Sequence, residues 1–366
     1  MINILHVLGG LGSGGAESLI MSVYRKIDIT KIRFDFLTRG ENDEELVMEI
    51  KELGGNVINI PKFPQKLLEN YKRLSEFFKH NHRKYDVVHI HANSLLYIKP
   101  ILEAKKYNMK VILHSHNTQS ANPLYNMLHY INRGRINELC DYRIACSANA
   151  GRWMFLDKKY TFLKNAIDIN KFQYNENVRE KIRNELNITN KFVIGHVGRF
   201  VPQKNHQLLV EIYEAFQGKY SDTCLMMIGE GRLEEKIKKL VKRKKIDNSV
   251  YFLGKKDNVE QYMQAMDCFL FPSSFEGLGI VLIEAQASKL PIITSRIIST
   301  EALIDKDNIF IVDSDNNIEI WMRKLEECLS SQNIRKSNGN LLREKGYDIE
   351  EMSCALIEIY RKVMAG

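Results

Sequence analysis

Short apolar runs alternate with longer amphipathic stretches along the whole chain, and this alternation limits the fold more than any other feature. In the first half, the runs INILHVL, RFDFLT, NVINIP, DVVHIHA, KVILHSH and YRIACS have the length and composition of buried strands. Between them, stretches such as AESLIMSVYRKI and LLENYKRLSEFFKHN carry apolar residues at helical spacing. Strands separated by helices of this length predict a doubly wound parallel sheet.

The second half repeats this plan. KFVIGHVG, TCLMMIG, VYFLG, CFLFPS, LPIITS and IFIVD alternate with the helical stretches NHQLLVEIYEAFQ, LEEKIKKLVKRKK and VLIEAQAS. A chain of 366 residues also exceeds the size at which one core usually suffices. We therefore predict an α/β fold with two Rossmann-like domains, residues 1–166 and 167–345, and a C-terminal helix over 346–366 that packs back towards the first domain.

A glycine-rich loop, GGLGSGGAES at residues 9–18, follows the first predicted strand. Three of its glycines fit the spacing G-x-G-x-x-G, and Asp35 follows 20 residues after the last of them, as in dinucleotide-binding proteins. Gly14 and Gly15 open a predicted helix, whose N-terminal amides favour a phosphate. We expect a phosphate-bearing ligand here, while the pattern leaves open NAD, another nucleotide or a purely structural loop.

A second loop, HVGRFVPQKNH at residues 196–206, places two cations after the first strand of the second half. Ligands of doubly wound sheets bind at the carboxyl ends of the strands. Arg199 offers a planar fork and Lys204 a point charge, so the two side chains suit a diphosphate. The alternative is a basic loop that is merely solvated.

Two glutamates, Glu276 and Glu284, flank the start of a predicted helix in FPSSFEGLGIVLIEAQAS. The backbone amides near Leu278, Gly279 and Ile280 are suited to a phosphate at this helix N-terminus. Glu284 would then accept hydrogen bonds from a ribose diol, and Glu276 from hydroxyl groups on the other side of the phosphate. In the simpler alternative, both carboxylates only stabilise the start of the helix.

These segments together resemble the family 4 glycosyltransferases, which have the two-domain GT-B fold. EGLGIVLIE and GRFVPQKN carry the resemblance, and LHSHNT, LKNAIDINKF, GEGRLEEKI and YFLGKKDNV extend it over nearly the whole chain. The most similar branch builds bacterial capsular and exopolysaccharide repeat units. The resemblance implies two domains that face a central cleft, and a retaining, metal-independent transferase that uses a nucleotide-diphosphate sugar, with UDP as the expected nucleotide.

The resemblance also implies roles for individual residues. Glu276 and His116 would contact the transferred sugar, and Glu284 would hold the ribose hydroxyls. Arg199 and Lys204 would neutralise the leaving diphosphate. Lys255 would lie beside the base. The chain departs from the family pattern at Ala166, where the family often has glycine. This difference affects the geometry of the domain junction more than the chemistry.

Two histidine pairs and one acidic motif raise the question of a metal. His89 and His91, like His114 and His116, share a face of a predicted strand, which allows a zinc site. Cysteines and carboxylates at metal-ligand spacing are absent nearby, so we expect a core role for His89 and no metal cofactor. The sequence DSD at 313–315 imitates a metal-binding D-x-D, but its position after a late strand favours a turn.

The net charge of +8 lies entirely in residues 1–165, which hold 24 Lys and Arg against 16 Asp and Glu. A basic half indicates an anionic partner such as a membrane surface, unless it is only a solvated surface. Residues 62–85 interleave basic and aromatic side chains, which favours peripheral membrane contact. The run KKLVKRKK at 238–245 ends a predicted helix and lacks any nucleic-acid motif, so we expect no nucleic-acid partner.

Six scattered cysteines without paired spacing predict free thiols. The N-terminus has no basic region, so we expect a cytoplasmic protein, peripheral on the inner face of the cell membrane. The expected partners are a nucleotide sugar and a glycan or lipid-linked acceptor. A sugar-nucleotide 2-epimerase and a non-catalytic nucleotide-sugar-binding protein remain alternatives. An NAD-dependent oxidoreductase would leave the charged residues of the second half unexplained.

Overall fold

The computed structural model describes residues 1–12, 14–117, 122–274, 279–296, 300–313, 317–330, 335 and 339–366. The chain divides into two compact units. The first contains Met1–Ile167 and Gly346–Gly366, and the second contains Asp168–Lys345. In the described ranges, no helix combines the length and the apolar character needed to cross a membrane.

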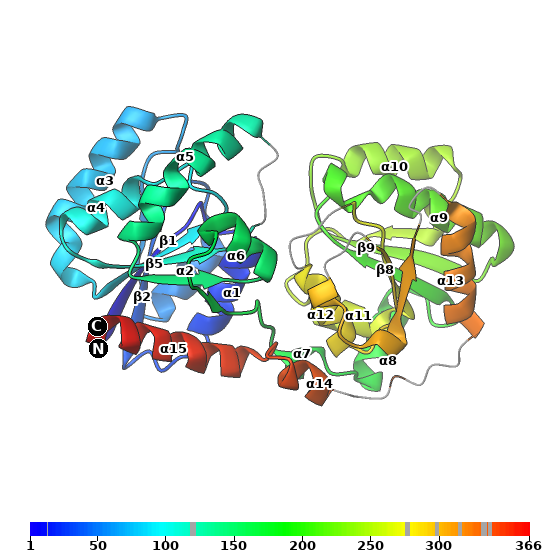
Figure 1. The fold of residues 1–366 in the computed structure, drawn as a ribbon. Coiled ribbons are helices and arrows are strands. Elements are labelled where there is room, and N and C mark those ends of the chain that lie inside the picture. The colour runs from blue at the N-terminus through cyan, green and yellow to red at the C-terminus, as the bar shows by residue number, and fades with distance from the viewer. Residues whose placement is uncertain are drawn as a thin grey trace. The chain divides into compact units, whose positions relative to one another are not determined.

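The first unit is built on a parallel sheet with strand order β3-β2-β1-β4-β5-β6-β7 and helices on both faces (Figure 1). Its strands are β1 (Ile2–Val7), β2 (Ile32–Thr38), β3 (Val57–Asn59), β4 (Val87–Ala92), β5 (Lys110–Ser115), β6 (Tyr142–Ala145) and β7 (Thr161–Phe162). Its helices are α1 (Gly15–Tyr24), α2 (Glu44–Glu52), α3 (Leu67–Asn81), α4 (Lys99–Lys106), α5 (Pro123–Leu139), α6 (Ala148–Phe155) and α15 (Ile349–Ala365). The strand order reverses between β1 and β4, which makes this the switch point of the sheet.

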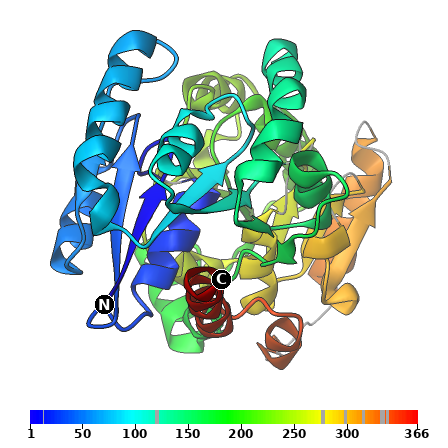
Figure 2. The same ribbon diagram turned by 60° about the vertical axis from the view of Figure 1, so that its left-hand side comes forward.

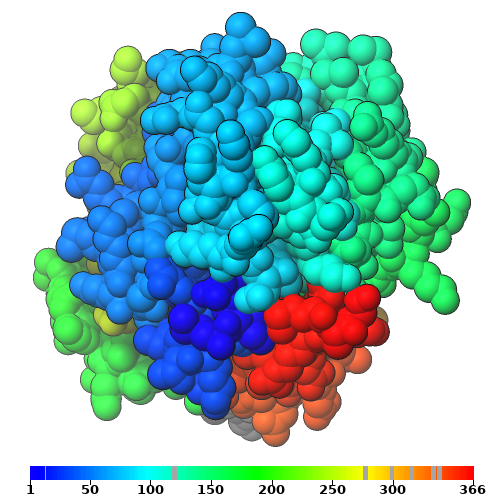
Figure 3. Space-filling model, turned by 90° about the vertical axis from the view of Figure 1, so that its left-hand side faces the viewer, coloured from blue at the N-terminus to red at the C-terminus, as the bar shows by residue number. Residues whose placement is uncertain are grey.

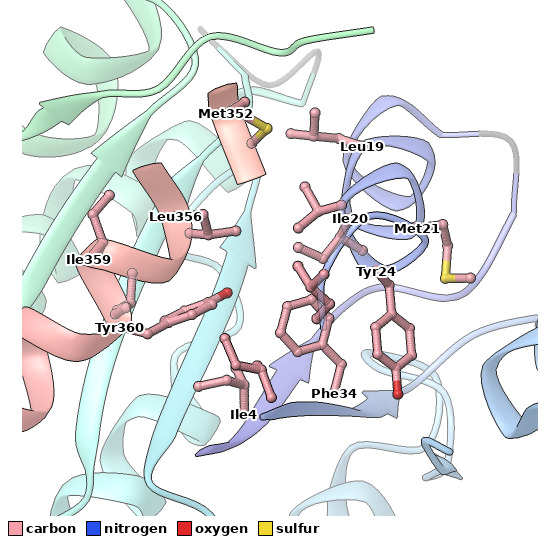
Figure 4. Packing of buried hydrophobic residues seen from close by; sticks show 14 of the residues in the cluster. Ile4, Leu19, Ile20, Met21, Tyr24, Phe34, Met352, Leu356, Ile359 and Tyr360 are labelled. Carbon is pink, nitrogen blue, oxygen red and sulfur yellow. The ribbon is translucent and has the colours of Figure 1, made fainter. Parts of the chain in front are cut away.

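The C-terminal helix α15 completes the core on one face of this sheet. Leu356 and Tyr360 are buried and belong to one apolar cluster with Ile4 and Phe34 (Figure 4). Helix α15, drawn in red, lies beside α1, drawn in blue (Figure 2). On the surface, the C-terminal residues lie next to the N-terminal residues (Figure 3). A separate cluster, which includes Leu74, fills the opposite face under α3 and α4.

The second unit has a parallel sheet of order β10-β9-β8-β11-β12-β13, and its switch point lies between β8 and β11. Its strands are β8 (Phe192–Val197), β9 (Thr223–Ile228), β10 (Val250–Phe252), β11 (Cys268–Phe271), β12 (Ile292–Ser295) and β13 (Ile309–Val312). Its helices are α7 (Ile169–Phe172), α8 (Glu176–Glu185), α9 (His206–Lys219), α10 (Glu234–Arg243), α11 (Val259–Ala265), α12 (Ile280–Ala287), α13 (Ile318–Ser330) and α14 (Gly339–Glu344).

Burial explains why these runs become interior strands. Every residue of β9 is buried, as expected for a strand covered by helices on both faces. Trp321 of α13 and Phe216 of α9 are fully buried against the same sheet. The predicted fold of two doubly wound parallel sheets is confirmed, and each apolar run quoted above contains one strand of the structure.

Candidate functional site

The loop after β8 holds the first pair of predicted site residues. Its backbone is fixed to the neighbouring loop after β9, because Gly198 N–H donates to Ile228 O at 2.9 Å and Phe200 N–H donates to Glu230 O at 3.0 Å. Between these anchors Arg199 is exposed. A charged fork therefore projects from a rigid backbone at the switch point of the second sheet.

Gly229 is the residue that permits this close approach of the two loops. Its φ is +137°, and a Cβ at this position would lie 2.2 Å from Gly198 O. A side chain here would need both a strained backbone and a displaced loop. The position of Arg199 therefore depends on a glycine in the adjacent loop.

Lys204 ends a short 3-10 turn, Pro202–Lys204, that leads into α9. Its ammonium group lies 4.7 Å from the centre of the Phe271 ring, at the end of β11, which is a favourable cation–π distance. The loops after β8 and β11 are also joined by a hydrogen bond from Ser274 N–H to Gln203 O at 2.9 Å. Lys204 is therefore held at the junction of the two strands that flank the switch point.

Helix α12 begins directly after β11, in the second part of the predicted site. Gly279 is its N-cap residue in the left-handed conformation, with φ of 72°, and no side chain among the described residues caps this end. The first amides of α12, from Ile280 onward, thus have the orientation that attracts an anion. Glu276 and Leu278, which were also predicted for this site, lie outside the described residues.

Glu284 lies in the second turn of α12 and has an unusual environment. The pKa of its carboxyl group is raised from 4.5 to about 7, chiefly by burial and then by the charge of Glu260, while the charge of Lys204 opposes both effects. Lys204 and Glu284 therefore interact electrostatically, although they are 80 positions apart in the sequence. Lys255, exposed after β10 and Gly254, lies at the same carboxyl edge of the sheet.

Glu260 is a residue of this site that the sequence analysis did not single out. It lies in the first turn of α11, the helix before β11. Its effect on the pKa of Glu284 shows that the two carboxyl groups share one environment. The predicted helix-strand alternation located α11, but its rotation about its own axis depends on packing against α8 and α7, and no local motif encodes that packing.

In the first unit, Gly14 is the N-cap residue of α1 and Gly15 its first residue. A Cβ on Gly14 would lie 2.1 Å from a carboxylate oxygen of Glu17, so that side chain folds over the start of the helix. A phosphate at this N-terminus would have to displace or share space with the Glu17 carboxylate, which repels it. The glycine spacing gave no sign of this neighbour.

Asp35 has a structural environment, which corrects its interpretation as a dinucleotide ribose ligand. It lies inside β2 and is buried, with its carboxylate accepting from Lys84 Nζ at 2.6 Å, Tyr85 Oη at 2.9 Å and Asn56 N–H at 2.8 Å. These bonds hold the pKa of Asp35 below its usual value despite its burial. A side chain committed to three internal donors is not available to a ribose.

His116 directly follows β5, where its Nε2 is 2.9 Å from His91 Nδ1. Burial lowers the pKa of His116 from 6.5 to about 3, so its imidazole is neutral at physiological pH. His89, predicted as a core histidine, is fully buried and is 2.8 Å from the Tyr360 hydroxyl.

Asp313, the first residue of the DSD sequence, pairs with Arg296 at 2.9 Å, and Asp315 lies outside the described residues.

Comparison with known protein families agrees with this arrangement. Residues 13–171 match the model described as Glycosyltransferase Family 4, and residues 178–345 match the model described as Glycosyl transferases group 1. The two matches cover most of both units. The chain belongs to the family 4 glycosyltransferases. The predicted resemblance and enzyme class are therefore confirmed.

Individual relatives resemble this glycosyltransferase over most of their length. The putative glycosyltransferase EpsF of Bacillus subtilis (strain 168) is 29% identical over 98% of this chain and 96% of its own length. A UDP-Gal:α-D-GlcNAc-diphosphoundecaprenol α-1,3-galactosyltransferase of Escherichia coli is 24% identical over 83% of this chain and 80% of its own. Both relatives include most of the two units.

A solved structure shows the same fold. HepE of Anabaena, in complex with UDP and glucose, superposes with a TM-score of 0.83, at 17% identity, over 99% of this chain and 100% of that chain. At this identity the likeness establishes the fold alone. The two sheets with their helices thus form the GT-B fold predicted from the motifs.

Proposed function

We propose that this glycosyltransferase moves a sugar from a nucleotide-diphosphate sugar to a hydroxyl group of a lipid-linked or glycan acceptor during synthesis of a bacterial surface polysaccharide. The observation that carries the proposal is that Lys204 and Glu284 lie in one environment at the switch point of the second sheet, where the lysine charge lowers the pKa of the carboxyl group. One end of this pair suits a diphosphate and the other suits a diol. A nucleoside diphosphate has both groups in one molecule.

Each part of the donor would contact a different set of residues in the second unit. The uncapped N-terminus of α12, beginning at Ile280, would receive phosphate oxygens, and Arg199 with Lys204 would neutralise them. Glu284 would accept hydrogen bonds from the ribose hydroxyls, and Lys255 would lie beside the base. UDP is the proposed nucleotide, supported by the sequence resemblance and by the UDP named for HepE and for the E. coli relative.

The reaction would break the bond between the anomeric carbon and the diphosphate oxygen and form a bond from that carbon to the acceptor oxygen, and the proton of the acceptor hydroxyl group would pass to the leaving diphosphate. Negative charge grows on the leaving diphosphate during this step. Preorganised cations and helix amides at that position lower the barrier, because they need no reorganisation when the charge develops. This protein-based neutralisation replaces a metal ion in the proposal. By resemblance, Glu276 and His116 would hold the transferred sugar, and the anomeric configuration would be retained.

The acceptor would be a lipid-linked glycan, as the name of the E. coli relative describes for that enzyme. Helix α5 of the first unit supports contact with a lipid surface. Leu124, Met127, Tyr130 and Ile131 are each at least half exposed, and their spacing places them along one side of the helix. Apolar side chains that recur on an exposed helix face favour a peripheral position at the membrane.

A transfer assay tests the proposal. A panel of UDP-, GDP- and dTDP-sugars is offered with an undecaprenyl-diphosphate-linked sugar, products are separated, and the anomeric configuration is read by NMR. We expect one donor to give a retained glycoside in the presence of EDTA. Glu276→Ala should lower the rate by about 100-fold or more, a typical cost of losing a transition-state contact.

The matched control is Asp313→Ala, which removes a carboxylate paired with Arg296 outside the proposed site and should stay active. Loss of activity in EDTA that is restored by a metal, together with an inactive Asp313→Ala variant, would refute metal independence. An epimerised nucleotide sugar without glycoside would identify the alternative epimerase, and tight nucleotide binding without turnover would identify a binding protein.

A further inference from the structure

Five histidines form one continuous row across the switch point of the first sheet. Strands β1, β4 and β5 are neighbours, and their registers pair His6 with His89 and His91 with His114. His116 follows two positions after His114, on the same side, because side chains alternate along a strand. The row lies on the face covered by α15, because His89 Nδ1 is 2.8 Å from the hydroxyl group of Tyr360 on that helix, which Figure 4 shows packed on this face.

Half of the ring nitrogens in this row have no hydrogen-bond partner. His6 Nδ1 is 2.9 Å from His91 Nε2, and His91 Nδ1 is 2.9 Å from His116 Nε2. His89 Nδ1 meets Tyr360 Oη. The remaining atoms are buried and unpartnered in the described part of the chain: His6 Nε2, His89 Nε2, His114 Nδ1, His114 Nε2 and His116 Nδ1. Buried polar atoms are usually paired, so this concentration of unpaired nitrogens makes the row a candidate for binding a ligand.

The chemistry of the row restricts that ligand to a cation with affinity for imidazole. An imidazole ring whose nitrogen has no hydrogen-bond partner can offer that nitrogen's lone pair to a metal ion, and His114 and His116 each have such a nitrogen among the described residues. A neutral ring that binds a metal through one nitrogen also needs no acceptor at that atom. Imidazole nitrogens favour zinc, copper, nickel and iron over magnesium or calcium.

We propose that His91, His114 and His116 form a binding site for a divalent transition-metal ion such as Zn²⁺, and that the bound ion inhibits the transferase. One ring nitrogen of each lies within 4.8 Å of the corresponding atoms of the other two. Nitrogens on a tetrahedral zinc ion lie about 3.4 Å apart, given Zn–N bonds of about 2.0–2.1 Å. His91 Nδ1 and His116 Nε2 are 2.9 Å apart and share a hydrogen bond, so the ion would take the place of the proton between them, and His114 must approach.

No hydrogen bond within the described residues opposes this movement of His114, because neither of its ring nitrogens has a partner there. Its ring centre is 4.0 Å from that of His116. Three histidines leave the fourth position of a tetrahedral ion open to water, as is common for zinc sites that are reached from solvent.

His6, His89 and His91 form a second group, in which one ring nitrogen of each lies within 4.8 Å of those of the other two. Access from solvent favours the group of His91, His114 and His116 over this second group. His6 and His89 are completely buried, whereas His91 and His116 are partly exposed at the carboxyl edge of the sheet. An ion from solvent therefore reaches His91 and His116 first. The inhibitory consequence rests on the proposed function, because it requires His116 to contact the transferred sugar; a ligand nitrogen held by a metal cannot do so.

Metal binding is measured first, without substrates. The background protein carries His80→Gln, His82→Gln and Cys354→Ser, which remove exposed groups that bind zinc adventitiously. Isothermal titration with Zn²⁺ should show one site, and Co²⁺ should give the intense d–d absorption of a tetrahedral nitrogen site. His114→Asn and His116→Gln should each weaken binding at least tenfold. His6→Asn, the control for the alternative group, should weaken binding less than either variant, although it removes the hydrogen-bond partner of His91 Nε2.

Circular dichroism and the melting temperature show whether each variant is folded, and His116→Gln, at a partly exposed position, serves if His114→Asn is not. Absence of Zn²⁺ or Co²⁺ binding overturns the proposal, as does equal weakening by His6→Asn. In the transfer assay, Zn²⁺ should inhibit reversibly with EDTA, and full activity with the site occupied would overturn the inhibitory role. Failure of transfer altogether, with Zn²⁺ still bound, would refute the proposed function and leave the metal site intact.

Discussion

At the scale of single residues, the second unit places opposite charges where a nucleotide has complementary groups. The cation of Lys204 is held over Phe271, and its charge reaches Glu284 across the switch point. Arg199 is fixed through its backbone neighbours and keeps an exposed side chain. A fork on a rigid backbone loses little entropy when it binds an anion, which makes this position effective.

Removing either cation should weaken binding of free UDP as well as of the donor. Charge-assisted hydrogen bonds contribute about 1.5–3 kcal/mol, which corresponds to roughly tenfold to 100-fold in affinity. Calorimetry on Arg199→Ala and Lys204→Ala measures this directly. Lys236→Ala removes an exposed lysine from α10 of the same unit, so it is the matched control for net charge. Unchanged affinity in both site variants would contradict the diphosphate role.

Glu284 should make stability depend on pH. The folded protein holds its proton up to a pKa of about 7, whereas the unfolded chain releases it near 4.5. The stability linked to this proton is therefore present below pH 4.5 and is lost as pH rises through 7. Glu284→Gln, which stays neutral, should raise Tm at pH 8, by roughly 2–4 °C for each kcal/mol of this linkage, and change it much less at pH 5.

Thermal unfolding of wild type and Glu284→Gln at the two pH values measures this difference. Glu319→Gln, which neutralises an exposed carboxylate on α13, is the control and should shift Tm equally at both. A Glu284→Gln variant that is less stable than wild type at pH 8 would show that the ionised carboxylate is stabilised by its surroundings.

The sequence predicted only those residues of the candidate site that belong to local motifs. Arg199, Lys204 and Glu284 were found because they follow strands and fit a family motif, and the structure brings Lys204 and Glu284 into one environment. Glu260 was missed because helix rotation depends on tertiary packing. His6 was missed because its pairing with His89 depends on strand order, which the alternation of elements does not specify.

At the scale of elements, apolar runs were sufficient to locate the strands of both sheets. The exception is β7 (Thr161–Phe162), a two-residue edge strand whose Phe162 is 43% exposed. Such a short and half-exposed segment has no periodicity to detect. Helix α15 was predicted to return to the first unit, and it packs there against α1 and β4. Its apolar stripe therefore has a structural role in that core.

The packing of α15 predicts a large effect from a small change. Leu356 is 1% exposed in the cluster shared by α1 and β1, so Leu356→Ala should destabilise the first unit by about 2–5 kcal/mol. Cys354→Ala changes an exposed position on the same helix and should cost little. Urea unfolding followed by circular dichroism compares the two variants. A similar midpoint for both would mean that α15 contributes little to the core.

At the scale of the whole molecule, the distribution of charge is less one-sided in space than in sequence. Several cations in residues 62–85 pair with carboxylates: Lys62 with Glu41, Lys66 with Glu69, Arg73 with Glu76, and Lys84 with Asp35. Ion pairs reduce the field that an anionic surface experiences. Net charge alone does not reveal these pairs: two of them join neighbouring residues three positions apart, and the other two join residues that are distant in the sequence.

Membrane contact should therefore depend on the apolar face of α5 at least as much as on the cations of α3. We expect peripheral binding to vesicles with anionic lipid, because each buried apolar side chain adds to an attraction of about 1 kcal/mol per cation near the surface.

Cosedimentation compares wild type with two variants. One changes Lys66, Lys72, Arg73 and Lys79 to Gln, and the other changes Leu124, Met127 and Ile131 to Ser. The α5 variant should lose most binding at physiological salt, where charges are screened beyond about 8 Å. The α3 variant should lose binding mainly at low salt. If wild type ignores anionic vesicles even at low salt, or if both variants bind as wild type does, neither helix is a membrane contact and the acceptor must reach the enzyme by another surface.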